Sequence, residues 1–434
     1  MRRMLCALLL LALAISAPAR AADYYVATTG SDTGGDGSSA RPWQTISHAA
    51  AQVAAADTVH VLAGVYAESV QSSASGTAGQ RIRFVSEPGW GAKIDATGHY
   101  TAWQNSGDYV DIVGFDITGA DYLGISNGGS YVRVVSNHVH HLATPTCNRP
   151  NGGAAIDHDD YSKHDNDTIG NFVDHVADQL VGCNQIHGIY HSNLRGHIWN
   201  NIVGQIGAYC IHNWHASTDV VIANNLVFGC KSGGIIVGDG DSPGGVTANN
   251  FVVTNNIVLD SPNGILEYGS FGTNNVYVNN LVYRCSVPLM LTNPDQGTLS
   301  VEPMLVDYRI DATGDYHLMS ASPCVDHGVA TGAPSDDFEG HARPFGAGID
   351  IGPYEWVAPG PDGGMGADAA ADAAVDARPD GSRSEAGASG GGATEYGGGC
   401  GCHAAGRLAS PSAVRALALV AGVLVGRRRR RPRA

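Results

Sequence analysis

The residues best suited to chemistry stand just after a repeated dipeptide, here called a step, in which a small residue precedes isoleucine. The steps are Gly124-Ile125, Ala155-Ile156, Gly188-Ile189, Cys210-Ile211, Gly234-Ile235 and Gly264-Ile265. If each isoleucine is buried in a strand, the residue after it points outward. That outward column is Ser126, Asp157, Tyr190, His212, Ile236 and Leu266, and the next outward position holds Asp159, Ser192, Trp214 and Gly238. The middle repeats therefore present acidic, aromatic and imidazole groups on one surface strip, and the later repeats present apolar groups.

This strip has the residue types that β-elimination on a uronic acid requires. The reaction needs a base for the proton beside the carboxylate, a group that neutralises the carboxylate, and an acid for the leaving oxygen. Tyr190 and His212, or His187 if the strand twists, are expected to supply the base and the acid. We predict the catalytic set Tyr190, His212, His187 and Asp157, with Trp214, His191, Asp239 and Glu267 binding substrate. Asp157, Asp159 and Asp160 are the expected ligands of Ca²⁺, which prefers several oxygen atoms.

Two other functions fit the same residues. A glycoside hydrolase needs two carboxylates, which Asp157 and Asp159 could provide with Asp239 or Glu267 from later repeats. A surface adhesin or structural module needs no catalytic group at all. His138, His140 and His141 show that the chain also uses histidine outside the strip, and the acidic run 157–167 also fits a solvated turn.

A second repeat defines the elements that must position these groups. Asparagine, one further residue and valine recur at uneven intervals, beginning at Asn137, Asn171, Asn201, Asn225, Asn256 and Asn280. The unit is too short for a strand–helix–strand crossover, so each repeat is read as short strands joined by turns. The pattern predicts an all-β, single-stranded parallel β-helix, with valine and isoleucine stacked inside and asparagine amides hydrogen-bonded from coil to coil.

We assign residues 23–356 to this β-helix domain. An Ala-rich amphipathic stretch, Ile46–Ala56, precedes the first coil strands. It predicts a helix across the open end of the stack, where the first coil would otherwise expose its core and a free strand edge.

The two ends of the chain carry different signals. Residues 1–21 combine a basic start, an apolar run and small residues, which is typical of a secretory signal peptide. Residues 357–395 are rich in Gly, Ala and Asp and predict a disordered acidic stalk. Residues 396–434 contain Gly399-Cys400-Gly401, an apolar segment and an arginine block, and they resemble a myxobacterial-type C-terminal sorting signal. An ordinary membrane anchor is the alternative for this segment. In either case we expect export to the cell surface or medium, with membrane contact only through the C-terminal anchor.

Charge and cysteine content restrict the partners. The net charge is −16 and the chain has only three lysines, so no basic stripe is available for nucleic acid. We expect a monomer whose partner is a polysaccharide. The body has six cysteines, and disulfides are expected in an exported domain. Neighbouring pairs (147–183, 210–230 and 285–324) would each link adjacent coils, although six cysteines allow about 15 pairings.

Both ends of the body resemble a known class. The opening YYVATTGSD…ARPWQTISHAA…ADTVHVLAGVYAESV and the ending GDYHLMSASPCVDHGV…DDFEGHARPFGAGIDIGPYEW are similar to secreted right-handed parallel β-helix proteins, including the pectate-lyase-9-like group. The resemblance implies a right-handed helix and a polysaccharide-lyase-like class, which also contains hydrolases. The Lys-plus-Asp calcium site of that group has no clean counterpart here; the nearest stretch is Asp157–Asp167.

Overall fold

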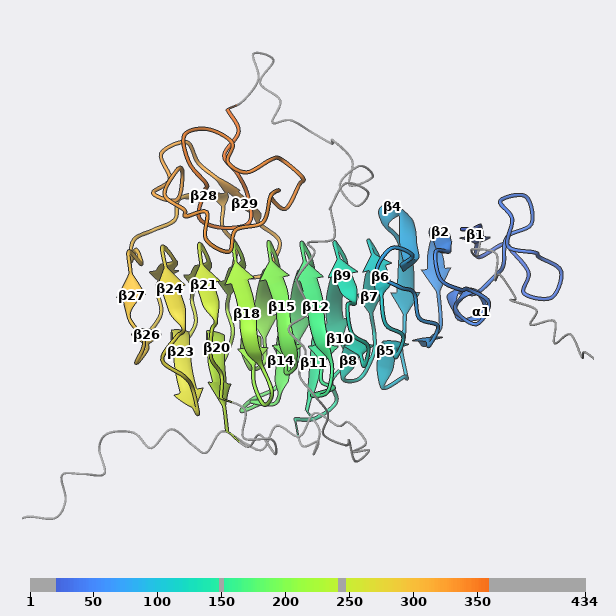
Figure 1. Cartoon of the computed structure of the whole chain (residues 1–434), viewed down its shortest axis with the longest axis horizontal. Coiled ribbons are helices and arrows are strands. Elements are labelled where there is room, and N and C mark those ends of the chain that lie inside the picture. The colour runs from blue at the N-terminus through green and yellow to red at the C-terminus, as the bar shows by residue number, and fades with distance from the viewer. Residues whose placement is uncertain (1–20, 148–151, 241–246, 359–434) are drawn as a thin grey trace, which may run out of the picture.

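The computed structural model describes residues 21–147, 152–240 and 247–358. Short strands run parallel and stack coil upon coil along the long axis of the molecule (Figure 1). The predicted all-β parallel β-helix is confirmed. Each coil contributes strands to three ladders, which we call the first, second and third sheets.

The first and second sheets share the long strand β4 and form an 18-stranded unit. The first sheet comprises β1 (Asp23–Val26), β2 (Thr58–Tyr66), β4 (Ile82–Asp95), β6 (Val110–Val113), β9 (Arg133–Val135), β12 (His164–Ile169), β15 (Leu194–Trp199), β18 (Thr218–Ala223), β21 (Val252–Thr254), β24 (Val276–Val278) and β27 (Asp295–Gln296). The second sheet continues from β4 through β7 (Asp116–Thr118), β10 (His138–Leu142), β13 (Phe172–Val176), β16 (Ile202–Ile206), β19 (Leu226–Phe228), β22 (Ile257–Leu259) and β25 (Leu281–Tyr283).

The third sheet carries the predicted site. It comprises β3 (Val70–Ser72), β5 (Thr101–Asn105), β8 (Leu123–Asn127), β11 (Gly153–His158), β14 (Ile186–His191), β17 (Tyr209–Asn213), β20 (Gly233–Asp239), β23 (Asn263–Gly269) and β26 (Val287–Met290). Its strands lie in the lower half of Figure 1, away from the C-terminal segment.

A continuous asparagine ladder fixes the turn between the first and second sheets. Asn171 donates from its backbone N (2.9 Å) and its Nδ2 (3.0 Å) to Oδ1 of Asn201. The same amide-to-amide bond joins every step from Asn137 to Asn280. All six side chains are fully buried, so each amide satisfies groups that have no access to water.

The small residue before each isoleucine has a packing role. At Gly188 and Gly234 an added Cβ would lie 2.5 and 2.4 Å from a valine Cγ1, on Val203 and Val258 respectively. Those valines belong to the Asn-x-Val repeat. The small residue and the valine are therefore the two sides of one interior contact, which explains why both repeats run together through the chain.

The N-terminal end is capped as expected, but by a shorter helix. Helix α1 spans Ile46–Ala50, five residues, rather than Ile46–Ala56. Thr45 is its N-cap and accepts a hydrogen bond from His48 N, while the carboxylate of Glu68 accepts from Ile46 N and Ser47 N. These side-chain acceptors satisfy the first amides of the helix.

The C-terminal segment packs on the outside of the second sheet and does not close the last coil. It contains the antiparallel pair β28 (Leu305–Asp307) and β29 (Asp315–Leu318), seen above the stack in Figure 1. Its apolar residues, including Leu305, Tyr316 and Ile351, bury the outward side chains of β16, β19, β22 and β25. Four asparagines in left-handed conformation donate to its carbonyls, namely Asn200, Asn224, Asn255 and Asn279.

Two of the three suggested disulfides are present, Cys147–Cys183 and Cys210–Cys230. The third pairing is wrong, because Cys285 and Cys324 are both free. Cys285 packs against the core inside the coils, whereas Cys324 lies in the separate core between the second sheet and the C-terminal segment. The sheet itself separates the two thiols.

Residues 1–20 of the predicted signal peptide, the predicted stalk from residue 359 onward and the whole predicted sorting segment lie outside the described residues. Among the described helices, none is long and apolar enough to cross a membrane.

Candidate functional site

The predicted column on the third sheet exists in the predicted register. Asp157 pairs with Ser126 on one side and with Tyr190 on the other, and Tyr190 pairs with His212. The next members along the column are Ile236 and Leu266. The register therefore brings together groups that lie far apart in the sequence.

The column is not the solvent-exposed strip that we expected. Asp157 and Tyr190 have no exposed surface, and His212 is only 6% exposed. Trp214, expected to stack on a sugar, is itself buried; its indole lies against the backbone of Gly238 and Gly240.

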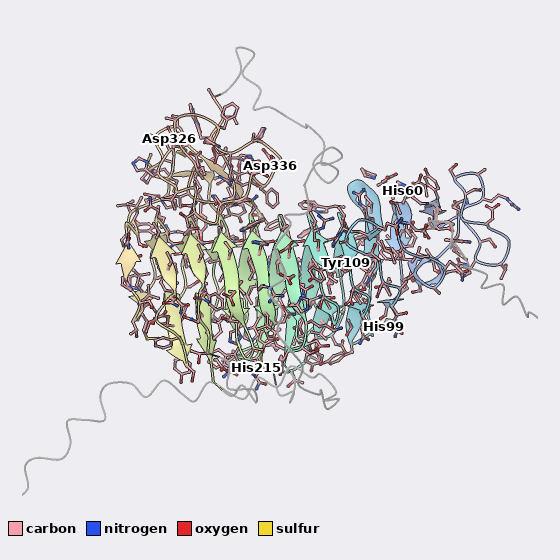
Figure 2. The ribbon with its side chains drawn as sticks, viewed as in Figure 1. His60, His99, Tyr109, His215, Asp326 and Asp336 are labelled. Atoms are coloured by element: carbon pink, nitrogen blue, oxygen red, sulfur yellow. A yellow bond between two sulfur atoms is a disulfide. The ribbon has the colours of Figure 1, made fainter. Side chains whose placement is uncertain are left out.

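Aromatic packing contributes to this burial. The ring of Tyr209 lies 5.1 Å from that of His212, and the ring of Trp214 lies 5.4 Å from it. Tyr161 stacks near His215 at 4.5 Å. Figure 2 labels His215 at the lower edge of the stack, on the opposite side from Asp326 and Asp336 of the C-terminal segment.

Two histidines form the polar centre of the column. A hydrogen bond of 2.8 Å joins His212 Nδ1 to His187 Nε2. Burial lowers the pKa of His187 to about 3 and also holds the pKa of His212 well below its usual range. Both imidazoles are therefore neutral at pH 7, which is the protonation state that a general base requires. The Tyr190 ring lies 5.2 Å from His212 and 5.6 Å from His187.

Two of the residues expected to bind substrate, His191 and Glu267, lie inside the coil instead. His191 follows the outward Tyr190 and therefore points inward, where its ring meets the position of a Cβ on Gly196. Burial lowers the pKa of His191 to about 4. Asp239 is also buried, at the end of β20.

Glu267 is the second inward residue, and its carboxylate is already occupied. It accepts five hydrogen bonds, which come from Asn275, Tyr277, Thr292 N, Asn293 N and Asn293 Nδ2. Burial alone would raise the pKa of Glu267, but these donors lower it on balance. Since Leu266 is the outward residue of this strand, Glu267 cannot complete a carboxylate pair with Asp157 on the outer face.

The three aspartates expected to bind calcium are not gathered as a site. Asp157 is buried on the outer face, whereas Asp160 is partly exposed and its Oδ1 accepts from Ser162 N and Oγ. Within the described part of the chain, the group of three potential ligands that meets a 4.8 Å limit is elsewhere, at His141, Asp174 and His175. Among the described residues, Asp157, Asp159 and Asp160 do not meet this limit as a group, and we assign no catalytic step to calcium.

Tyr209 is a member of the site that the sequence argument missed. It lies two residues before Ile211, as His187 lies two residues before Ile189, and the two rings are 6.0 Å apart. Burial raises the pKa of Tyr209 to about 12. The signal was present in the sequence, because a second outward column lies three positions before the one that we followed.

Comparison with known proteins supports the architecture. A family model described as "Pel9A-like, right handed beta helix region" matches residues 24–190. The solved structure of the pectate lyase Pel9A superposes with a TM-score of 0.53 at 17% identity, covering 77% of this chain and 96% of that chain. The fold is thus a right-handed parallel β-helix, as predicted.

Other solved β-helix structures are less similar. An alginate lyase from Paenibacillus sp. str. FPU-7 has a TM-score of 0.46 at 17% identity, covering 58% of this chain and 92% of its own. A rhamnogalacturonan lyase has a TM-score of 0.41 at 13% identity, covering 66% of this chain and 91% of its own. No curated protein matches the chain.

Proposed function

We propose that this protein acts on polysaccharide, as a lyase that cleaves uronic-acid-containing glycan by β-elimination on the outer face of the third sheet. The observation that carries the proposal is the hydrogen-bonded pair of neutral imidazoles, His187 and His212, beside Tyr190. The likeness of the fold to Pel9A, which its description names a pectate lyase, supports the same substrate class.

Each side chain then has a definite role. His212 removes the proton beside the uronate carboxylate, and His187 orients it through the 2.8 Å bond. Tyr190 donates its proton to the oxygen that leaves. The electron pair of the broken C–H bond becomes the new double bond as the glycosidic C–O bond breaks. The products are one chain with an unsaturated end and one with a new hydroxyl.

Burial of the column favours a second candidate, a non-catalytic glycan-binding or structural module. Because Asp157 and Tyr190 have no exposed surface, elimination requires the side chains packed over them to move away. A binding module requires no such movement and would use the partly exposed Tyr209 and Tyr268 at the rim of the cluster.

Product analysis distinguishes these functions. The full chain is mixed with a panel of uronic-acid polysaccharides, with added calcium and then with a chelator, and ultraviolet absorbance is followed. The lyase proposal predicts a rise that Tyr190→Phe and His212→Gln abolish and that the control Tyr131→Phe retains, since Tyr131 stacks on Tyr109 just before the first-sheet strand β6. New reducing ends without ultraviolet absorbance would indicate a hydrolase, and retention on glycan without either product would indicate a binding module.

We also propose that the chain is exported and held at the cell surface. The proposal rests on the order of segments at its two ends, a signal peptide in residues 1–21 and a Gly-Cys motif, apolar segment and arginine block in residues 396–434. Fractionation of cells that express the full chain, compared with a variant truncated at residue 395, tests it. Retention of the truncated variant at the surface would contradict it.

A further inference from the structure

A second histidine cluster lies on the outer face of the second sheet. His141 and His175 occupy equivalent positions in successive coils, and their rings stack at 4.5 Å with an interplanar angle of 8°. Asp174 lies between the two coils: its Oδ1 is 2.6 Å from His175 Nδ1 and 4.0 Å from His141 Nδ1. One potential ligand atom from each of the three residues lies within 4.8 Å of the others.

The backbone presents the two imidazoles in the same way. His141 and His175 both have left-handed backbone conformation, with φ of 47° and 51°. Each stands four residues after a ladder asparagine, Asn137 or Asn171, so the fixed turn of the helix sets the spacing. The parallel rings therefore follow from the coil geometry and not from a chance encounter of surface side chains.

Neighbouring histidines hold the cluster from outside. His138 Nε2 lies 2.7 Å from Asp174 Oδ2, which orients the carboxylate so that Oδ1 faces His141 and His175. His140 Nδ1 lies 2.8 Å from His141 Nδ1, a contact that an ion bound to this nitrogen of His141 would replace, and His140 Nε2 lies 2.8 Å from Asp116. Carboxylate–imidazole contacts of this kind typically orient metal-binding side chains.

The cluster is open to solvent, unlike the later coils of the same sheet. His141 exposes 62% of its side chain and His175 exposes 25%. From β16 onward the outward residues are apolar and the C-terminal segment covers them, and its edge reaches Phe172 of β13, whose ring lies 6.4 Å from that of Tyr316. An ion can therefore reach His141 and His175 directly from water.

We propose that His141, Asp174 and His175 form a binding site for a divalent transition-metal ion of the zinc type. Zinc takes imidazole nitrogen and carboxylate oxygen at about 2.0–2.2 Å, which places tetrahedral ligand atoms about 3.3 Å apart. The observed separations of 2.6 and 4.0 Å bracket this value, so small side-chain rotations suffice. Three protein ligands leave one position for water or an external group.

The test is a metal titration of the full chain without a histidine tag, after chelator treatment. Zn²⁺ is titrated in competition with a chromophoric chelator, and Co²⁺ is used for its visible absorption. We expect one ion per chain. The double variant His141→Asn/His175→Asn should bind at least about tenfold more weakly, since loss of even an outer-shell partner costs 10–100-fold. Asparagine is chosen because it tolerates the left-handed conformation, and a thermal melt checks that the variant is folded.

The matched control is His317→Asn. His317 also lies between two carboxylates, 2.6 Å from Asp315 and 3.2 Å from Glu339. The His317→Asn substitution should leave the zinc affinity unchanged. Absence of tight binding to the native chain, equal affinity in the folded double variant, or an equal loss in the His317 control would each overturn the proposal.

Discussion

The same coils carry two histidine clusters on different sheets, and their surroundings make them chemically different. On the third sheet, His187 and His212 are buried and hydrogen-bonded to each other. On the second sheet, His141 and His175 are partly exposed and share the carboxylate of Asp174. Burial lowers the pKa of the first pair and keeps both imidazoles neutral at pH 7, whereas solvent and a carboxylate make the second pair suited to a cation. The comparison shows that histidines on different faces of one solenoid take their chemistry from what covers each face.

The interior ladder should give the largest effect, because it supports both clusters. Asn201→Ala removes the acceptor of two Asn171 donors and the donor to Thr168 O. Each unsatisfied buried group costs about 1–3 kcal/mol, so we expect about 3–5 kcal/mol of lost stability in urea unfolding. The exposed Asn274→Ala should change stability by less than about 0.5 kcal/mol; an equally small loss in Asn201→Ala would show that the ladder is not essential.

The next largest effect is expected at acid pH, where the buried histidine cluster should lower the stability of the fold more than the exposed cluster does. The folded-state pKa of His187 is about 3, below the unfolded value near 6.5, so only the unfolded chain binds a proton between these values. Stability should therefore be complete above pH 6.5 and fall as the pH drops toward 4, by about 1.4 kcal/mol per pH unit, or about 3 kcal/mol in all, for one such histidine. Urea unfolding at several pH values measures the slope.

Two variants sharpen this measurement. His187→Gln should flatten the slope between pH 6.5 and 4, because it removes one buried imidazole. His141→Asn should change the slope less, since 62% of that side chain remains in water. Equal slopes in the native chain and His187→Gln would contradict a buried neutral imidazole at this position.

Sequence predicted the parts of the structure that repeat. The Asn-x-Val and small-residue–Ile steps predicted the parallel coils, the asparagine ladder and the register of Asp157, Tyr190 and His212, because all three depend on local alternation. Burial of that column depends on aromatic residues such as Tyr209 and Trp214 that meet only in the fold. The prediction that Glu267 binds substrate did not take its direction into account. Leu266 pairs with the outward Ile236, so the next residue, Glu267, points into the coil.

A glycine substitution tests whether the small-residue step is a packing requirement. A Cβ at position 234 would lie 2.4 Å from Val258 Cγ1 and 2.8 Å from Gly264 O. Gly234→Ala should therefore cost about 1–3 kcal/mol, as overpacking of a core does. Gly79→Ala is the matched control, because nothing lies within 4 Å of its added Cβ. Similar melting temperatures for both variants would argue against the contact.

The smallest effect is expected at the exposed cluster. His141→Asn removes a mostly exposed imidazole 4.0 Å from Asp174, and exposed ion pairs contribute about 0–1 kcal/mol. We expect a change in unfolding free energy below about 1 kcal/mol in metal-free buffer. A larger loss would mean that the second-sheet cluster supports the fold and is not reserved for a ligand.

The most direct test of the central proposal is ultraviolet absorbance of the full chain with uronic-acid polysaccharide at neutral pH. We expect a steady rise from the unsaturated product, with the rate lowered about 100-fold or more in His212→Gln and Tyr190→Phe and unchanged in Tyr131→Phe. A rise that survives His212→Gln would place the chemistry elsewhere, and a flat trace with every polysaccharide would contradict elimination on the third sheet.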